Sequence, residues 1–234
     1  MNEMDSVTEK TCPARAAIRS GRPPRELAGE VEGRILDAAC QVFLERGFEG
    51  ASIEEIAEVA RAGKPTIYAR FPNKGALFAA ALARELSARV ARVAQYAPKG
   101  ATPEEKVMSI AVSLVRETLT KEWLGLVRLA IAETRRFPDL GNNICRTARE
   151  QGAEAMARLL AEVAATAELG TLPAFSPENC ATAARYLAEL TLLPLLLRAL
   201  AGESLEALHA EIVPHVSKRV VFFLAACRHG GITR

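Results

Sequence analysis

Two short stretches on either side of a basic turn, residues 52–60 and 64–71, constrain the fold of this chain more than any other feature. Ser52-Ile-Glu-Glu55 has the capping-box pattern, in which a hydroxyl and a carboxylate each accept a hydrogen bond from a backbone N–H at the start of a helix. The next apolar residues recur at i, i+3, i+4 and i+7, which is one helical face: Ile53, Ile56, Ala57 and Ala60. The pattern predicts a short amphipathic helix that ends at Ala60.

The second stretch predicts another short helix with a different surface. Ile67 and Phe71 are spaced to anchor it inward, and the side chains expected to point outward are polar or basic: Lys64, Thr66, Tyr68 and Arg70. A buried helix followed by a polar, basic helix is the arrangement of a helix-turn-helix, whose second helix enters the major groove of DNA. The two stretches therefore predict a DNA-reading unit.

Several motifs, taken in order, resemble the N-terminal domain of TetR/AcrR-family transcriptional regulators over about residues 31–82. They are Arg34-Ile-Leu-Asp-Ala-Ala39, Phe43-Leu-Glu-Arg-Gly-Phe48, the segment 52–57, Lys64-Pro-Thr-Ile-Tyr68 and Phe71-Pro-Asn-Lys74. The resemblance implies a homodimeric, ligand-responsive and usually repressive DNA-binding protein with an all-helical effector domain. The remaining two thirds of the chain are similar to this family only in their helical pattern.

The resemblance also implies which residues contact a palindromic operator in double-stranded DNA. The positions that match are Lys64, Pro65, Thr66, Tyr68, Arg70 and Lys74. By the same resemblance Tyr68, Lys74 and Ser52 would hold phosphates, and Lys64, Thr66 or Arg70 could reach base edges. Three alternatives stay open, since Tyr68 could be a packing residue, Lys74 a solvated charge and Ser52 only a helix cap.

The turn between the two helices departs from the family pattern at two positions. Arg61 stands where glycine is usual, and Gly63 stands where a small hydroxyl residue is common. A left-handed conformation at Arg61 would cost about 1 kcal/mol. The alternative is that Gly63 supplies this conformation, which would change the geometry of the turn.

Charge is distributed unevenly although the net charge is only +2. Residues 10–25 contain five basic residues and no acid, residues 59–84 contain five more and no acid, and residues 26–58 hold nine acids against two arginines. Residues 1–26 lack helical periodicity and are expected to form a disordered basic tail. Its end, Gly21-Arg-Pro-Pro-Arg25, could be an extended arm that lays Arg22 and Arg25 into a minor groove, or only a solvated segment.

Composition predicts an all-α fold of about nine helices, because helix formers dominate nearly every window and aromatic residues make up only 5% of the chain. We expect a helix-turn-helix domain in residues 27–74 and a ligand-binding and dimerisation domain in residues 75–234. We expect a first helix from near Leu27 or Val31 to Arg46, with Gly47 as its stop. Caps at Asn73 and Thr102, together with proline and glycine positions, place the later helices at residues 74–97, 103–120, 121–137, 138–169, 176–201 and 205–228.

The last two of these helices are long and unusually apolar. Residues 187–200 contain eight leucines, so little of the first helix is left for water. Packing the pair against a two-fold copy would make a four-helix interface, and the family resemblance implies a homodimer of this kind. The alternative is a helix buried inside its own subunit. Pro194 and Pro214 are expected to bend the two helices.

The effector half combines apolar helical faces with occasional polar groups, which is typical of a small-molecule site. The candidates for contact with a small apolar or amphipathic ligand are Trp123, Phe137 and Tyr186. A tryptophan at helical spacing is also a common core residue. We expect a repressor that such a ligand releases from its operator.

Other classes of protein find little support. The five cysteines contain no Cys-x-x-Cys pair, which disfavours a metal site, and no cofactor or catalytic motif such as G-x-S-x-G or a P-loop is present. The apolar tract 187–201 is interrupted by Glu189, Pro194 and Arg198, so we expect no membrane span and a cytoplasmic protein. The alternative to a regulator is a helical ligand-binding or interaction protein without operator binding.

Overall fold

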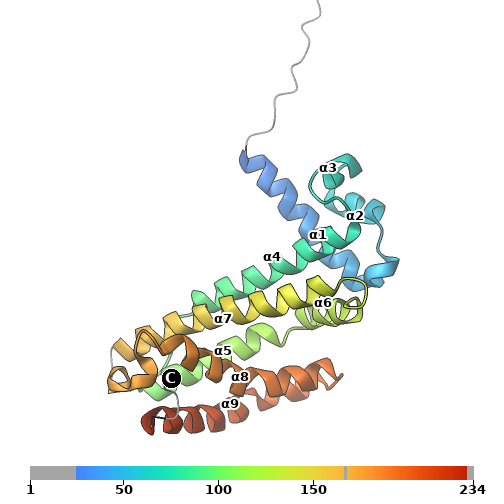
Figure 1. The fold of residues 1–234 in the computed structure, drawn as a ribbon. Coiled ribbons are helices and arrows are strands. Elements are labelled where there is room, and N and C mark those ends of the chain that lie inside the picture. The colour runs from blue at the N-terminus through green and yellow to red at the C-terminus, as the bar shows by residue number, and fades with distance from the viewer. Residues whose placement is uncertain (1–24, 166–167, 231–234) are drawn as a thin grey trace, which may run out of the picture.

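The computed structural model describes residues 25–165 and 168–230, and within them it contains nine α-helices, two short 3-10 helices and no strand (Figure 1). The predicted all-α fold is confirmed. The elements are α1 (Arg25–Gly50), α2 (Ile53–Ala60), α3 (Lys64–Tyr68), α4 (Lys74–Ala94), α5 (Pro103–Thr118), α6 (Lys121–Ala132), α7 (Pro138–Ala165), η1 (Glu168–Thr171), η2 (Pro173–Phe175), α8 (Cys180–Leu200) and α9 (Leu205–Arg228).

Two apolar cores organise these helices. The first joins α1, α2, α3 and the N-terminal half of α4 to one face of α6, and it includes Trp123, Leu126 and Ala130. The second joins α5, α7, α8 and α9 to the C-terminal end of α4 at Val93. Figure 1 shows α4 running from the small helical unit at one end of the molecule along α7. The domain boundary expected between residues 74 and 75 falls in the first turn of α4. The apolar core of the N-terminal domain nevertheless includes α4 residues as far as Leu86.

Side-chain caps explain where four of these helices begin, namely α2, α4, α5 and α6. Asn73 Oδ1 accepts a hydrogen bond from Ala76 N at 2.8 Å, and Thr102 forms a complete capping box with Glu105. The capping box predicted at Ser52 forms only in part. Ser52 Oγ accepts from Glu55 N at 3.0 Å, but the Glu55 carboxylate is ion-paired with Arg46 Nε at 3.0 Å.

Several predicted boundaries are wrong by a few residues. The first helix begins at Arg25, before the expected end of the tail, and it is interrupted at Gly47 (φ 72°), the predicted stop. The segment 133–137 forms turns, because the Glu133 carbonyl accepts from Arg136 N (3.0 Å) and Phe137 N (2.8 Å) ahead of Pro138. α7 ends at Ala165, short of 169, and residues 168–171 are 3-10 instead.

The predicted start of α8 at Ser176 is also wrong. The Ser176 carbonyl accepts from Asn179 N at 3.0 Å and Cys180 N at 2.9 Å, so residues 176–179 form a turn and the helix starts at Cys180. α8 and α9 both continue through their prolines, and Arg198 of α8 is ion-paired with Glu203 and, at 2.7 Å, with Glu211 of α9. These contacts fix the corner between the two helices.

α8 is the one helix of the described chain that is long and apolar enough to cross a membrane by length and composition. The sequence analysis considered only residues 187–201 and expected no membrane span. The helix that meets the length and composition test is longer, because it starts at Cys180. A single such helix is weak evidence for a span, and α8 packs here against α5, α7 and α9.

Candidate nucleic-acid interface

The turn between α2 and α3 is closed by Arg61, which has a left-handed backbone (φ 49°, ψ 47°). Gly63 is extended (φ −70°, ψ 144°) and serves as the N-cap of α3. Of the two alternatives drawn from the sequence, Arg61 therefore takes the strained conformation, at a cost of about 1 kcal/mol relative to glycine.

α3 is anchored on one side and open on the other. Ile67 is fully buried and Phe71 is buried, as the sequence predicted, while the Tyr68 side chain is about half exposed (51%). Lys64 and Pro65 are exposed and Thr66 is half-buried. Figure 1 places α3 at the end of the molecule away from α8 and α9, so nothing in the described fold covers its outer face. That face is therefore accessible to a partner.

Two of the predicted base-reading side chains have partners inside the chain. Lys64 Nζ donates to the Glu54 carboxylate of α2, and this hydrogen bond holds the pKa of Glu54 below its usual range. Arg70 Nη1 donates to the Thr66 carbonyl at 3.2 Å, and its Nε lies 3.9 Å from a carboxylate oxygen of Glu32. A DNA phosphate or base that binds either residue has to compete with these partners.

Lys74 and Ser52 lie at the base of the helix-turn-helix. Lys74 Nζ donates to the carbonyls of Glu49 (3.1 Å) and Ala51 (3.0 Å) and lies 4.8 Å from the centre of the Phe48 ring. One of its three ammonium hydrogens remains for a further acceptor. Ser52 is half-buried and caps α2. Both residues connect the α1–α2 loop to neighbouring helix starts.

The proposed N-terminal arm is only partly visible. Arg22 lies outside the described residues. Arg25 is the first residue of α1, so its backbone is helical where the sequence predicted an extended segment.

The three candidate ligand residues do not come together. Trp123 is buried in the first core, where the Arg89 guanidinium lies 4.9 Å from its ring centre, and it does not line the three cavities compared among the described residues, at the α4–α7, α5–α7–α8 and α5–α9 contacts. Tyr186 is 43% exposed on α8 and also lines none of them. Phe137 lines a cavity of about 500 Å³ between the first half of α4 and the start of α7.

A second cavity, of about 450 Å³, opens between α5, α7 and α8. Its lining includes residues that the sequence analysis did not single out: Leu114, Arg149, Gly152, Arg185 and Glu189. They come from segments far apart in the chain, so no local pattern could have grouped them. The only sequence signal is the run of small residues Ala148, Gly152 and Ala153 on one side of α7.

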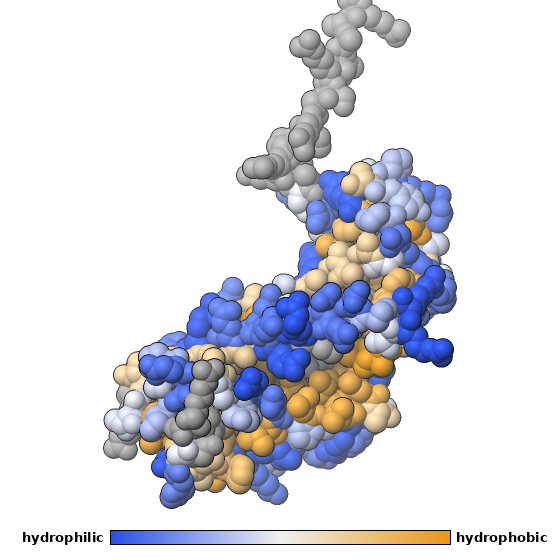
Figure 2. Space-filling view, in the orientation of Figure 1, coloured by the Kyte–Doolittle hydropathy of each residue, from blue (hydrophilic) through white to orange (hydrophobic). Residues whose placement is uncertain are grey.

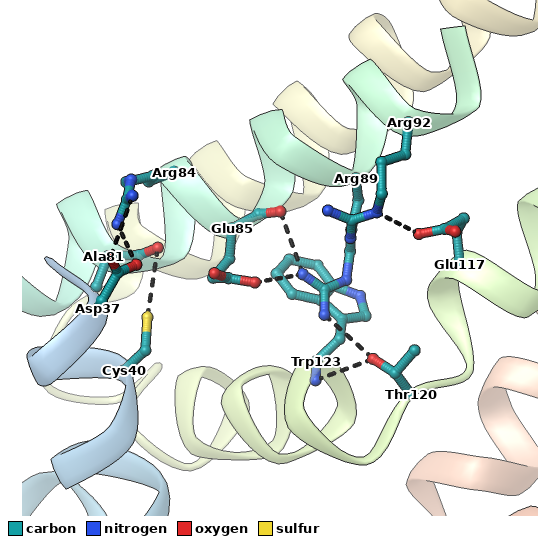
Figure 3. A network of polar contacts seen from close by, with 10 residues as sticks. All are labelled: Asp37, Cys40, Ala81, Arg84, Glu85, Arg89, Arg92, Glu117, Thr120 and Trp123. Atoms are coloured by element: carbon teal, nitrogen blue, oxygen red, sulfur yellow. Dashed lines mark hydrogen bonds and ion pairs between the residues drawn. The ribbon is translucent and has the colours of Figure 1, made fainter. Parts of the chain in front are cut away.

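A polar network ties α4 to its neighbours (Figure 3). Arg89 is 8% exposed; it donates to Glu85 Oε2 at 2.5 Å and to Thr120 Oγ1 at 3.1 Å, and its Nε is buried without a partner. Thr120 in turn caps α6. Arg84 binds Asp37 of α1. The orientation of the DNA-reading unit therefore depends on contacts along α4.

Family models match both parts of the chain. Residues 35–81 match the model described as bacterial regulatory proteins of the tetR family, and residues 105–228 match the C-terminal domain of AefR-like transcriptional repressors. The transcriptional activator FasR of Mycolicibacterium smegmatis is 39% identical over 83 residues, which is 36% of each protein. Three further relatives are named as repressors. The chain aligns with 36% of FasR, 29% of the repressor SCO4008 of Streptomyces coelicolor and 56% of the regulator YvkB of Bacillus subtilis, less than two thirds of each.

Solved structures resemble the chain over most of its length. A TetR-family regulator from Mesorhizobium loti has a TM-score of 0.70 and 25% identity, over 85% of this chain and 97% of that one. The flavonoid-responsive regulator FrrA is 31% identical with a TM-score of 0.57, again over 85% and 97%. The helix-turn-helix geometry, the helical second domain and these matches agree, and the chain belongs to the TetR family of helix-turn-helix transcriptional regulators.

Proposed function

We propose that this DNA-binding regulator is a homodimeric repressor that leaves a palindromic operator when a small apolar or amphipathic ligand binds its second domain. The observation that carries the proposal is the exposed polar face of α3, held in place by the buried Ile67. The relatives named as repressors support repression. FasR is named as an activator, so the direction of regulation needs a test. Because its target is DNA, we infer that it works in the cytoplasm.

In the bound state, we infer that the first turn of α3 enters the major groove. Tyr68 and Lys74 would hold phosphates, with Ser52 at the N-terminus of α2 as a third phosphate contact. Thr66, Lys64 and Arg70 are the residues that could reach base edges, the last two after exchanging their carboxylate or carbonyl partners for DNA. Pro65 would pack against the groove wall, and Arg22 and Arg25 would add contacts from the N-terminal segment.

The dimer would form through α8 and α9. Large apolar side chains are exposed on these helices: Leu193, Leu197, Val213, Val221 and Phe222, with Leu197, Val221 and Phe222 each more than 60% exposed. Figure 2 shows apolar side chains gathered over α8 beside the hydrophilic surface of α7. Burying them against a two-fold copy makes a four-helix interface and sets two α3 helices against successive major grooves, about 34 to 36 Å apart.

The dimer is tested with Leu197→Glu and Phe222→Glu. Each should convert the protein to a folded monomer in sedimentation experiments and abolish operator retention, because one recognition helix alone binds weakly. Ile131→Glu is the control, since Ile131 is 53% exposed on α6 and should leave the dimer intact. A dimer that survives both charged substitutions on α8 and α9 would contradict this interface.

Operator binding is tested by footprinting the purified protein on DNA upstream of its own gene, with and without candidate ligands. Thr66→Ala should change the sequence preference, and Tyr68→Ala should weaken binding to all sequences about equally. Transcription from the footprinted promoter decides between repression and activation. The alternative, a helical ligand-binding protein that does not bind an operator, predicts no salt-dependent retention on any duplex.

A further inference from the structure

The cavity between α5, α7 and α8 combines an apolar wall with two positive charges, one of which, Arg185, lies 5.9 Å from the centre of the Tyr186 ring. Its volume of about 450 Å³ lies within the usual range for small-molecule sites. Leu114, Leu192 and Leu196 supply the wall, and Arg149 and Arg185 stand on opposite helices at its edge. Among the described residues neither guanidinium is in an ion pair, although most other arginines of the same domain have carboxylate or carbonyl partners.

The charges of the lining favour an anion. Glu189 is the one acidic residue among those that line the cavity, so the lining carries one more positive than negative charge. An arginine binds a carboxylate or sulfonate through two parallel N–H donors, which gives geometric selectivity as well as energy. We propose that this cavity is the effector site and that it takes an amphipathic organic anion, with the acid group between Arg149 and Arg185 and an apolar body against the leucines.

The proposal rests on the ligand-responsive regulator proposed above and names the class of its ligand. Gly152 lines the cavity, and substituting it allows the cavity to be filled. A Cβ atom built at Gly152 meets no heavy atom within 4 Å, so a side chain there enters open space at the cavity wall without strain. Gly152→Leu therefore fills the cavity while improving helix propensity in α7, and Gly152→Ala improves propensity but fills little of it.

The experiment titrates the full-length protein with two fluorescent probes that differ in one acid group. 8-Anilinonaphthalene-1-sulfonate is the anion, and N-phenyl-1-naphthylamine is its neutral counterpart. Gly152→Leu should weaken binding of both, and Gly152→Ala should leave both unchanged. The pair Arg149→Gln and Arg185→Gln should weaken the sulfonate about tenfold and leave the neutral probe unaltered. Glu189→Gln should strengthen sulfonate binding.

The control for net charge is the pair Arg116→Gln and Arg158→Gln, which are exposed and away from the cavity. Sulfonate binding unchanged by Gly152→Leu, equal weakening of both probes by the Arg149 and Arg185 pair, or loss of the dimer in Gly152→Leu would overturn the proposal. Operator retention is measured on the same proteins without probe. If the protein does not retain operator DNA, the proposed function fails. If it retains operator DNA but the two probes do not respond to the substitutions as described, only this inference is lost.

Discussion

At the scale of single residues, the DNA-reading unit depends on side chains in unusual backbone or hydrogen-bonding positions. Arg61 is the only residue other than glycine with a positive φ in the described part of the chain. Lys74 donates to the carbonyls of Glu49, at the end of α1, and Ala51, in the loop that follows, so a residue expected to bind DNA also holds its own domain together. Local sequence revealed the position of each residue but not this second role.

Arg61→Gly should stabilise the protein by roughly 0.5 to 1 kcal/mol, because glycine adopts the left-handed conformation without the Cβ penalty. Urea unfolding measures the change. Arg61→Ala, which keeps the Cβ, should give no such gain. Gly63→Ala is the second comparison, since Gly63 has a negative φ and its Cβ would meet Pro65 Cδ at 3.6 Å, an ordinary contact. A marked loss of stability in Gly63→Ala, with no gain in Arg61→Gly, would mean that the left-handed conformation was assigned to the wrong residue.

Lys74→Ala should have two separable effects. Loss of the two carbonyl contacts should lower the free energy of unfolding by about 1 to 2 kcal/mol. Loss of a phosphate contact should weaken binding to all sequences about equally and reduce the salt dependence of binding by roughly one unit. Lys121→Ala, an exposed lysine at the start of α6, is the control. An unchanged salt slope would leave Lys74 with its structural role alone.

At the scale of elements, the turn between α6 and α7 packs against the base of the helix-turn-helix. The Phe137 ring lies 5.3 Å from that of Phe48, edge to face, and Arg136 is ion-paired with Glu49. A Cβ at Gly75, in the first turn of α4, would come within 2.9 Å of Phe137 Cε1. The absence of a side chain at Gly75 is therefore what lets Phe137 lie close to α4.

This close contact predicts that substitutions at Gly75 and Phe137 have non-additive effects on stability. Gly75→Ala should destabilise the native protein by about 1 kcal/mol or more, because the new methyl group forces the ring to move. In a Phe137→Ala background the same substitution should be nearly neutral or stabilising. A double-mutant cycle in thermal or urea unfolding gives the coupling energy. Additive effects would show that the ring and the helix start do not constrain each other.

The α8–α9 pair should make stability depend on pH through His215. Its Nε2 lies 3.0 Å from the Thr191 carbonyl, and burial together with the nearby Arg219 lowers the pKa of His215 below 6.5. The unfolded chain then binds a proton more readily than the folded one, so stability is lost as pH falls through about 6.5. His215→Gln should lose less stability between pH 7.5 and pH 5.5 in urea titrations, while His229→Gln, exposed beyond α9, should behave like the native protein.

Element by element, sequence patterns succeeded where the determinants are local. Thr102, Asn73 and the helical face of α2 act within a few residues of themselves, and their predicted roles are confirmed. The sequence left Trp123 as either a ligand contact or a core residue, and local spacing could not show that it packs beside Arg89 of another helix. The second cavity was missed for the same reason, since its walls meet only after α5, α7 and α8 have packed. Contacts between distant segments decide these cases, and no periodicity encodes them.

At the scale of the whole molecule, packing protects three cysteines to different degrees, since Cys180 and Cys227 are buried and Cys40 is half-buried. Burial raises the pKa of Cys40 to about 12 and of Cys227 to about 11, and it also raises the pKa of Cys180. The thiolate, which is the reactive form, is therefore scarce at each. With Cys12, Cys40 and Cys145 replaced by serine, the thiols of Cys180 and Cys227 should react with a disulfide reagent only as fast as the protein unfolds. Rapid labelling of the folded protein would contradict this packing.

The sharing of α4 between the two apolar cores has a consequence for engineering. A DNA-reading head cut after residue 74 would leave behind Leu77, Phe78, Ala81 and Leu82, together with the face of α6 that covers them. Such a fragment should not keep its shape. Chimeric regulators that exchange operator preference should be joined within the C-terminal half of α4 and should carry a matching α6. The DNA-reading domain completes its apolar core only with these two segments.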